Sequence, residues 1–268
     1  MSAGARGAAA GPALLRSVPV TAESATTASV KRAIVIGASS GIGRALALRL
    51  AREGYAVGLA ARRLPLLLEL KEQIGPGAFV KGIDVSDPLR AMPLLEELIE
   101  EMGGADLIVL NAGTGQINPE LAWGPEDETI GVNVHGFAAM AIVAYRHLVR
   151  RGAGHLVSIS SVAALRGGGA APAYNASKAF VSTYMDGLRH RLARIGSPVA
   201  ITDIQPGFVH TAMAQGPHVF WAASPEKAAE QIWLAIRRRK KRAVITRRWR
   251  LVAWLMKVVP DAVYHRVG

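Results

Sequence analysis

The sequence predicts a doubly wound α/β fold, in which one parallel sheet carries helices on both faces. Short apolar runs alternate with amphipathic segments of helical period from residue 30 onward, which is the pattern of repeated strand–helix–strand units. Half of the 268 residues are hydrophobic and 28 are glycine, as buried strands and tight loops require. A chain of this length buries one sizeable core, so we expect a single domain.

The individual elements follow from local patterns. Residues 33–36 are a short run of branched apolar side chains, typical of a buried parallel strand. The next segment has apolar residues at helical spacing and ends before Gly54, and Pro198 and Pro206 bracket the sixth strand. We expect about seven strands, at residues 33–37, 56–60, 78–83, 106–110, 155–159, 199–204 and 242–246. We expect helices at residues 42–53, 63–74, 88–102, 126–150, 173–195 and 225–238.

The loop after the first strand carries Gly37, Gly41 and Gly43 in the pattern G-x-x-x-G-x-G. Glycines allow a sharp turn and a close approach of the backbone to a pyrophosphate. The helix that follows offers free N–H groups and the positive end of its dipole. Because a strand precedes the glycines and a helix follows them, the loop predicts a nucleotide site.

A second motif, YNASK, places Tyr174 and Lys178 four residues apart, on one face of a predicted helix. A nearby ammonium favours the phenolate, so the pair suits proton exchange with an alcohol or carbonyl oxygen. Ser161 ends a predicted strand 13 residues before Tyr174. A hydroxyl at the carboxyl end of a parallel strand lies where α/β sheets bind ligands, and there it would hydrogen-bond a substrate oxygen.

These motifs occur together with NAG at 111–113, Asn133 in NVHG and PGFVHT at 206–211. In their order and spacing the chain resembles the short-chain dehydrogenase/reductase family. The resemblance implies a Rossmann-like fold, with Tyr174 as acid/base and Ser161 as the residue that orients the substrate oxygen, in preference to its neighbour Ser160. It implies that Lys178 holds the nicotinamide ribose and eases ionisation of Tyr174. Asn133 would kink its helix to hold a water that links Lys178 to solvent.

The same resemblance implies the cofactor contacts. Asn111 would steady the central sheet beside the cofactor. Asp84 matches the adenine contact, although an Asp that starts a loop is equally a cap, and both interpretations stay open here. The full set comprises Gly37, Ser39, Ser40, Gly41, Ile42, Gly43, Arg62, Asp84, Val85, Asn111, Ala112, Gly113, Tyr174, Lys178, Pro206, Gly207, Val209 and Thr211.

The end of the second strand indicates which cofactor binds. An enzyme that prefers NAD usually carries a carboxylate there to accept from the ribose 2′-OH. This chain has Ala61 followed by Arg62 and Arg63, and guanidinium groups suit a 2′-phosphate. We therefore expect NADP in preference to NAD, with Arg62 as the contact and Arg63 in solvent. The alternative is that both arginines merely begin a helix.

Composition excludes several other classes of function. The chain has no cysteine, which rules out disulfides, thiol catalysis and thiolate metal sites. The seven histidines show no metal-ligand spacing, so we expect no metal. The net charge is +12, but no recognition motif accompanies it, so we expect no nucleic-acid partner.

Both ends differ from the dinucleotide-binding part, which we place at residues 30–248. Residues 1–29 are rich in small residues and contain two prolines, which predicts a disordered tail, with a transit peptide as the alternative. The resemblance implies a mobile substrate lid at 208–224, which is apolar in this sequence. Residues 237–250 carry nine basic residues and no acid, and 249–268 are apolar and aromatic. This extension suits an anionic membrane surface, a dimer contact, or a roof over the substrate site.

We therefore expect an enzyme that reduces the carbonyl of a hydrophobic small molecule with NADPH. The alternative is a peripheral membrane or scaffold protein that binds nucleotide without turnover. The resemblance also implies a homo-oligomer, a dimer or tetramer paired through helices 126–150 and 173–195. We expect a cytoplasmic protein, with peripheral membrane contact through the C-terminal segment as one of the three alternatives above. That segment is too short and too charged to span a bilayer.

Overall fold

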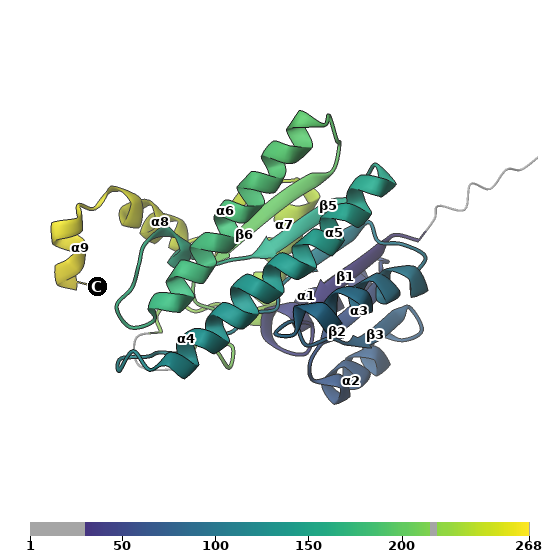
Figure 1. Ribbon diagram of the computed structural model, residues 1–268, viewed down its shortest axis with the longest axis horizontal. Coiled ribbons are helices and arrows are strands. Elements are labelled where there is room, and N and C mark those ends of the chain that lie inside the picture. The colour runs from purple at the N-terminus through teal and green to yellow at the C-terminus, as the bar shows by residue number, and fades with distance from the viewer. Residues whose placement is uncertain (1–29, 215–218, 268) are drawn as a thin grey trace, which may run out of the picture.

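Seven parallel strands form one sheet in the order β3-β2-β1-β4-β5-β6-β7 (Figure 1). The computed structural model describes residues 30–214 and 219–267. The expected tail at 1–29 and residues 215–218 of the expected lid lie outside these ranges. The strands are β1 (Arg32–Ile36), β2 (Ala56–Ala61), β3 (Ala78–Gly82), β4 (Leu107–Leu110), β5 (His155–Ile159), β6 (Ala200–Pro206) and β7 (Arg242–Ile245). The strand order reverses between β1 and β4, where such sheets bind ligands beyond their carboxyl ends.

Helices cover both faces of the sheet (Figure 1). They are α1 (Gly41–Arg52), α2 (Leu64–Ile74), α3 (Pro88–Glu101), α4 (Trp123–Ile130), α5 (Phe137–Arg151), α6 (Pro172–Arg194), α7 (Pro225–Arg237), α8 (Trp249–Val258) and α9 (Asp261–Val267). Alternate residues of β1 face opposite sides: Val35 joins the core under α1, α2 and α7, and Ile34 joins the core under α3, α5 and α6. Burial on both faces explains why the strands read as continuous apolar runs.

The predicted fold class is confirmed, because the structure has a doubly wound, Rossmann-like sheet of seven strands. The main difference lies in the segment expected as one helix at 126–150. That segment starts earlier and is divided into α4, a π-helical stretch η1 (Gly131–Gly136) and α5. A short 3₁₀ helix, η2 (Val162–Leu165), follows β5.

The C-terminal segment forms two short helices (yellow in Figure 1), of which α8 packs beside η2 and β7. Pro260 separates α8 from α9, and Val259 before it has an extended backbone with φ −66° and ψ 126°, as the residue before a proline prefers. Among the described residues, no helix is long and apolar enough to cross a membrane.

Candidate active site

The glycine loop between β1 and α1 is packed too tightly for side chains. A Cβ on Gly43 would lie 2.1 Å from the Gly37 carbonyl oxygen, and one on Gly37 would lie 2.6 Å from the Ala112 nitrogen. Gly37 also has φ +90°, which favours glycine. Asn111, which follows β4, donates from Nδ2 to the Gly37 carbonyl over 2.8 Å, so it ties the glycine turn to the end of β4.

This loop leaves the start of α1 open to an anion. Ser40 precedes the helix and makes no side-chain cap hydrogen bond, so the first N–H groups stay available. From the segment after β6, Thr211 packs over the loop, since a Cβ on Gly41 would lie 2.9 Å from Thr211 Cγ2. The glycine cradle and the free helix end fit the pyrophosphate of a dinucleotide, while Ile42 and Ser39 lie in the same turn.

Tyr174, Ser161 and Lys178 converge beyond the carboxyl end of β5. Tyr174 lies in the first turn of α6, and the Ser161 hydroxyl lies close enough to the Tyr174 phenol to act on its pKa. Lys178 lies one turn further on, with Nζ 5.7 Å from the centre of the Tyr174 ring. Its ammonium donates to the Ile159 carbonyl over 3.2 Å, which anchors it to the end of the strand.

Burial dominates the ionisation of both groups. Burial raises the pKa of Tyr174, and the Ser161 hydroxyl opposes that rise. Burial lowers the pKa of Lys178 to about 8, and the charge of Asp203 opposes that fall. We expected the ammonium to bring the phenol pKa toward neutrality, but the structure gives the opposite direction. The physical reason is that the phenol is itself withdrawn from water, which disfavours its anion.

Asn133 lies in the π-helical stretch η1 and joins two parts of the site. Its Oδ1 accepts from the Thr114 backbone N–H over 2.8 Å, and its Nδ2 donates to the Thr114 carbonyl over 2.7 Å and to Ser177 Oγ over 3.0 Å. A Cβ on Gly113 would lie 3.2 Å from both Asn133 Oδ1 and Lys178 Nζ. The side chain is therefore close to Lys178, with Gly113 between them.

Sequence reasoning missed Gly115, which lies under the ring of Tyr174. A Cβ there would lie 2.4 Å from Tyr174 Cδ2, so the ring rests on bare backbone. The signal was available, because Gly115 stands two residues after the NAG motif in NAGTG. Its role depends on a contact across 59 positions of sequence, which no local pattern reveals.

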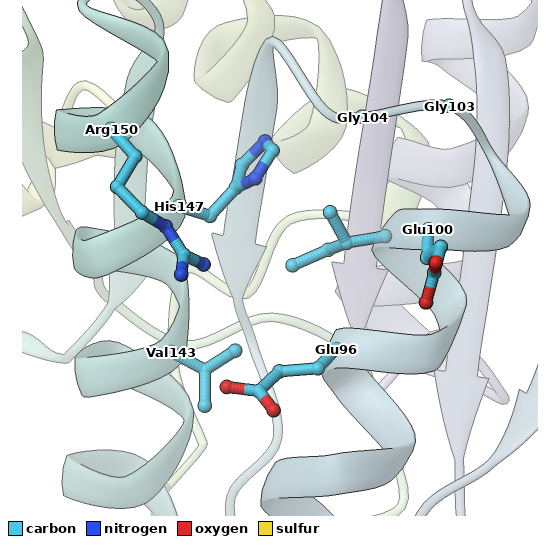
Figure 2. Close-up of a pocket in the computed structure, with 8 residues that line it drawn as sticks. Glu96, Glu100, Gly103, Gly104, Val143, His147 and Arg150 are labelled. Atoms are coloured by element: carbon cyan, nitrogen blue, oxygen red, sulfur yellow. The ribbon is translucent and has the colours of Figure 1, made fainter.

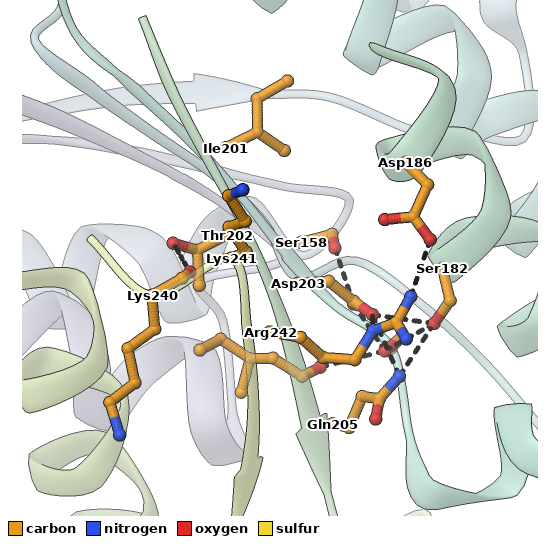
Figure 3. Close-up of polar contacts among 12 residues, drawn as sticks. Ser158, Ser182, Asp186, Ile201, Thr202, Asp203, Gln205, Lys240, Lys241 and Arg242 are labelled. Atoms are coloured by element: carbon orange, nitrogen blue, oxygen red, sulfur yellow. Dashed lines mark hydrogen bonds and ion pairs between the residues drawn. The ribbon is translucent and has the colours of Figure 1, made fainter. Parts of the chain in front are cut away.

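A buried polar cluster is centred on Asp203 (Figure 3), whose charge acts on Lys178 of the site. Asp203, on β6, is fully buried and accepts from Ser158 over 3.0 Å, Ser160 over 2.6 Å and Ser182 over 2.8 Å. Gln205 Nε2 adds a contact of 3.1 Å, and Arg242 Nε lies 3.7 Å from the carboxylate. Ser160 thus belongs to this cluster, whereas its neighbour Ser161 contacts Tyr174.

The two arginines after β2 behave differently from each other. Arg63 donates from Nη2 to Ser39 Oγ over 2.9 Å and to Ser40 Oγ over 2.6 Å. Arg62 is exposed at the end of the strand. Arg63 is exposed as well, as we expected of a solvent residue, but its guanidinium is also hydrogen-bonded to two serine hydroxyls of the glycine loop.

The remaining predicted contacts also lie at the carboxyl edge. Asp84, after β3, accepts from the N–H and the hydroxyl of Ser86 over 3.0 and 2.7 Å, which is an Asx turn. The cap of α3 is Asp87, not Asp84. Val85 is buried against the backbone of Gly136. Pro206 ends β6, Gly207 follows it, and Val209 forms an isolated bridge with Ala223.

A surface groove between α3 and α5 lies at the opposite, amino-terminal edge of the sheet (Figure 2). Its lining includes Glu96, Glu100, His147 and Arg150. His147 Nε2 lies 3.1 Å from both the N–H and the carbonyl oxygen of Ala105, and burial lowers the pKa of the imidazole. The ring therefore makes a structural contact with the turn before β4. We assign this groove no part in the chemistry.

The chain is similar to a known protein family and to several oxidoreductases. The family model for short chain dehydrogenases matches residues 31–218. An uncharacterized oxidoreductase of Myxococcus xanthus is 43% identical over 186 residues, which cover 68% of this chain and 73% of that protein. An uncharacterized oxidoreductase of Mycobacterium tuberculosis is 31% identical over 247 residues, which cover 88% of this chain and 96% of that protein.

Solved structures of related fold bind either nicotinamide cofactor. A short chain dehydrogenase/reductase from Burkholderia phymatum in complex with NAD is 25% identical, with a TM-score of 0.77 over 84% of this chain and 92% of that one. An alcohol dehydrogenase from the archaeon Thermococcus sibiricus, complexed with 5-hydroxy-NADP, is 26% identical, with a TM-score of 0.69 over 81% and 96%. Sequence, fold and site together show that the chain belongs to the short-chain dehydrogenase/reductase family.

Proposed function

We propose that this protein reduces the ketone of a hydrophobic small molecule with NADPH. Membership in the family makes the chain an NAD(P)-dependent oxidoreductase. The observation that supports the finer proposal is the contact of Tyr174 with Ser161 beside Lys178, next to a glycine loop with no room for side chains. When bound, the cofactor supplies a hydride to the carbonyl carbon, so the products are the alcohol and oxidised cofactor.

The side chains divide the proton chemistry between them. Ser161 donates a hydrogen bond to the substrate oxygen and holds it beside the Tyr174 hydroxyl. Tyr174 gives its proton to that oxygen as negative charge develops there. Its raised pKa favours the protonated form that reduction requires. Lys178 holds the nicotinamide ribose, and its ammonium stabilises the phenolate that remains. Asn133 supports the return of a proton to Lys178 through water.

An apolar wall beside Ser161 supports a hydrophobic substrate. Phe208 and Phe220 pack on Trp249. Their ring centres lie 5.1 and 5.0 Å, respectively, from that of Trp249. Val162 and Leu165 of η2 belong to the same cluster. This cluster reaches from Trp249 of α8 to Val162, which follows Ser161 in the sequence. A substrate whose carbonyl is held at Ser161 would therefore place its other atoms against apolar surface.

The direct test is turnover with a panel of ketones of graded hydrophobicity. We expect purified protein to oxidise NADPH with apolar ketones, and Tyr174→Phe to lower kcat at least 100-fold, since the lost proton donor contributes about that much. The variant should still bind NADPH, measured by fluorescence. Failure of the whole panel, together with no rise of Tm on addition of NADPH, would favour a nucleotide-binding scaffold instead.

The preference for NADPH rests on the end of β2. No carboxylate stands there, and Arg62 and Arg63 offer guanidinium groups to a 2′-phosphate. We expect Arg62→Ala to weaken NADPH binding about tenfold while NADH binding is unchanged. Arg63→Ala separates the second arginine, and Arg52→Ala, an exposed arginine on α1, is the matched control. An unchanged ratio of the two dissociation constants in Arg62→Ala removes that residue from the proposal.

The assembly and the location follow the family. We propose a homodimer or homotetramer that pairs through α4–α5 and α6, in the cytoplasm. Light scattering coupled to size-exclusion chromatography measures the mass, and a monomer at micromolar concentration contradicts this part.

A further inference from the structure

Helix α8 has two apolar faces. One face packs on the enzyme: Trp249 and Ala253 are 5% and 4% exposed and share a cluster with Phe208. The other face carries Leu251, Trp254, Leu255 and Val258, which are 58%, 58%, 41% and 52% exposed. Their spacing of i, i+3, i+4 and i+7 places them in one line along the helix. We name these four side chains the outer stripe.

Cations border the outer stripe. Arg247, Arg248, Arg250 and Lys257 are exposed, and no acidic residue occurs between Arg237 and Pro260. Arg250 and Lys257 are seven residues apart, so they lie on one flank of the stripe, two turns from each other. An apolar line with a basic flank is the pattern of a helix that lies in the interface of an anionic membrane.

The lid extends the same surface. Trp221 and Phe220 are each 49% exposed. The Arg248 guanidinium lies 5.9 Å from the centre of the Trp221 ring, which places that ring beside the start of α8. Phe220 also stacks on Trp249, on the inner face of the same helix. Both exposed rings therefore lie beside the first turn of α8.

The far end of α8 is fastened to the loop between β5 and α6. Arg166 of that loop donates to the Val259 carbonyl, forms an ion pair of 3.3 Å with Asp261 and lies 4.8 Å from the Tyr264 ring centre. Tyr264 in turn donates its hydroxyl to the Gly167 carbonyl over 2.9 Å. The helix is therefore held at both ends, so the outer stripe has a fixed orientation on the enzyme.

We propose that the outer stripe docks the enzyme on the surface of an anionic lipid bilayer. The same cations disfavour a second copy of this chain, because a twofold contact through the stripe brings Arg250 and Lys257 toward their counterparts. Four side chains on one short helix give weak, reversible attachment that depends on charge. On the membrane the exposed Phe220 and Trp221 beside α8 would lie near the lipid, which deepens the proposed function by naming lipid-dissolved ketones as the substrate class.

Vesicle cosedimentation of the full chain tests the surface without any turnover. The probes are vesicles of phosphatidylcholine alone and of phosphatidylcholine mixed with phosphatidylglycerol. We expect the protein to pellet with the mixed vesicles only. The variant Leu251→Ser/Trp254→Ser should lose pelleting, while Leu89→Ser, which changes an exposed leucine of α3, should keep it. Arg250→Gln/Lys257→Gln should lower the partition coefficient about 30-fold, since each cation contributes roughly a factor of five.

The matched control for charge is Arg237→Gln/Arg238→Gln, which removes two exposed cations at the other end of β7 and should lower the coefficient much less. Sedimentation velocity of the same proteins in the absence of vesicles reports self-association. Equal pelleting of the wild type and the stripe variant overturns the proposal. So does a stripe-dependent dimer that leaves vesicles unbound. Ketone turnover of these variants is measured separately, so absent turnover with intact vesicle binding counts against the proposed function alone.

Discussion

At the scale of single residues, the site depends on the buried ammonium of Lys178, whose charge is disfavoured by its removal from water. Lys178 is buried, and its pKa falls to about 8 although Asp203 attracts its proton. Asp203 is the negative end of the cluster in Figure 3, held by three serine hydroxyls and by Gln205. The cluster therefore does more than satisfy buried hydroxyls, because its carboxylate keeps a cation within the active site.

Lys178→Met should therefore stabilise the fold while it abolishes activity. The fall of the Lys178 pKa from 10.5 to about 8 means that burying this charge lowers the free energy of unfolding at pH 7 by at most about 3 kcal/mol. Because the folded pKa lies below the unfolded one, the unfolded state binds more protons between the two values. Wild-type stability thus rises with pH from about 8 toward 10.5, and the difference from the variant shrinks. Urea unfolding at pH 7 and pH 9.5 measures both effects, with Lys71→Met as the exposed control. A variant less stable than wild type at pH 7 contradicts the prediction.

Gly115→Ala tests whether close packing on Gly115 positions the ring of Tyr174. The added methyl would lie 2.4 Å from Tyr174 Cδ2, so the ring has to move. A displacement of about 1 Å costs roughly 100-fold in kcat, whereas NADPH binding should persist because the cofactor cradle is untouched. Gly187→Ala is the control, since a Cβ there meets nothing within 4 Å. Steady-state kinetics with a tight-binding ketone measure kcat. An unchanged kcat in Gly115→Ala would show that Gly115 does not position the Tyr174 ring.

At the scale of elements, α8 contributes a wall through one side chain. Trp249 packs on Gly207, where a Cβ would lie 2.1 Å from Trp249 Cγ. Its stacking with Phe220 and edge contact with Phe208 link α8 to the segment between β6 and α7. Loss of this ring should release α8 from Phe208 and Phe220, because few other buried side chains of α8 join the cluster.

Trp249→Ala should therefore raise KM for apolar ketones about tenfold or more and leave the dissociation constant of NADPH unchanged. Truncation of a buried tryptophan typically costs 3–5 kcal/mol, roughly, and here the loss falls on a peripheral helix. Hydrogen exchange should increase in residues 249–258 and not in β1 or β4. Trp254→Ala is the control on the same helix, since that ring is 58% exposed. Faster exchange across the central sheet would show that Trp249 supports the whole fold instead.

The elements also show how far the sequence alone leads. The strands and the long helices were predictable because burial on both faces of the sheet produces apolar runs and glycine turns. The family resemblance implied a kink at Asn133, but not its form as a π-helical stretch over Gly131–Gly136, because these residues continue the helical pattern of the sequence. Residues 237–250 form one continuous basic run in the sequence. Because β7 lies within this run, the two ends of the run lie at opposite edges of the sheet. The hydrogen bonds of Arg63 depend on two serines 23 and 24 positions away.

At the scale of the whole molecule, the net charge of +12 creates a field that attracts anions. Both nicotinamide cofactors are anionic, and NADPH carries an additional phosphate. Charges remote from the site act on encounter only when ionic strength is low, because the screening length is about 30 Å at 0.01 M salt and about 8 Å at 0.15 M. The field should therefore accelerate cofactor binding in dilute buffer.

Arg237→Gln/Arg238→Gln isolates this remote contribution. Both residues are exposed at the amino-terminal edge of the sheet, opposite the cofactor site. We expect their loss to slow association of NADPH by about twofold at roughly 0.01 M salt and not at 0.15 M. The effect on NADH should be smaller because that ligand carries less charge. Stopped-flow quenching of protein fluorescence measures the rate constants. If the slowing persists at high salt, the two arginines act through structure near the site and the field is not the cause.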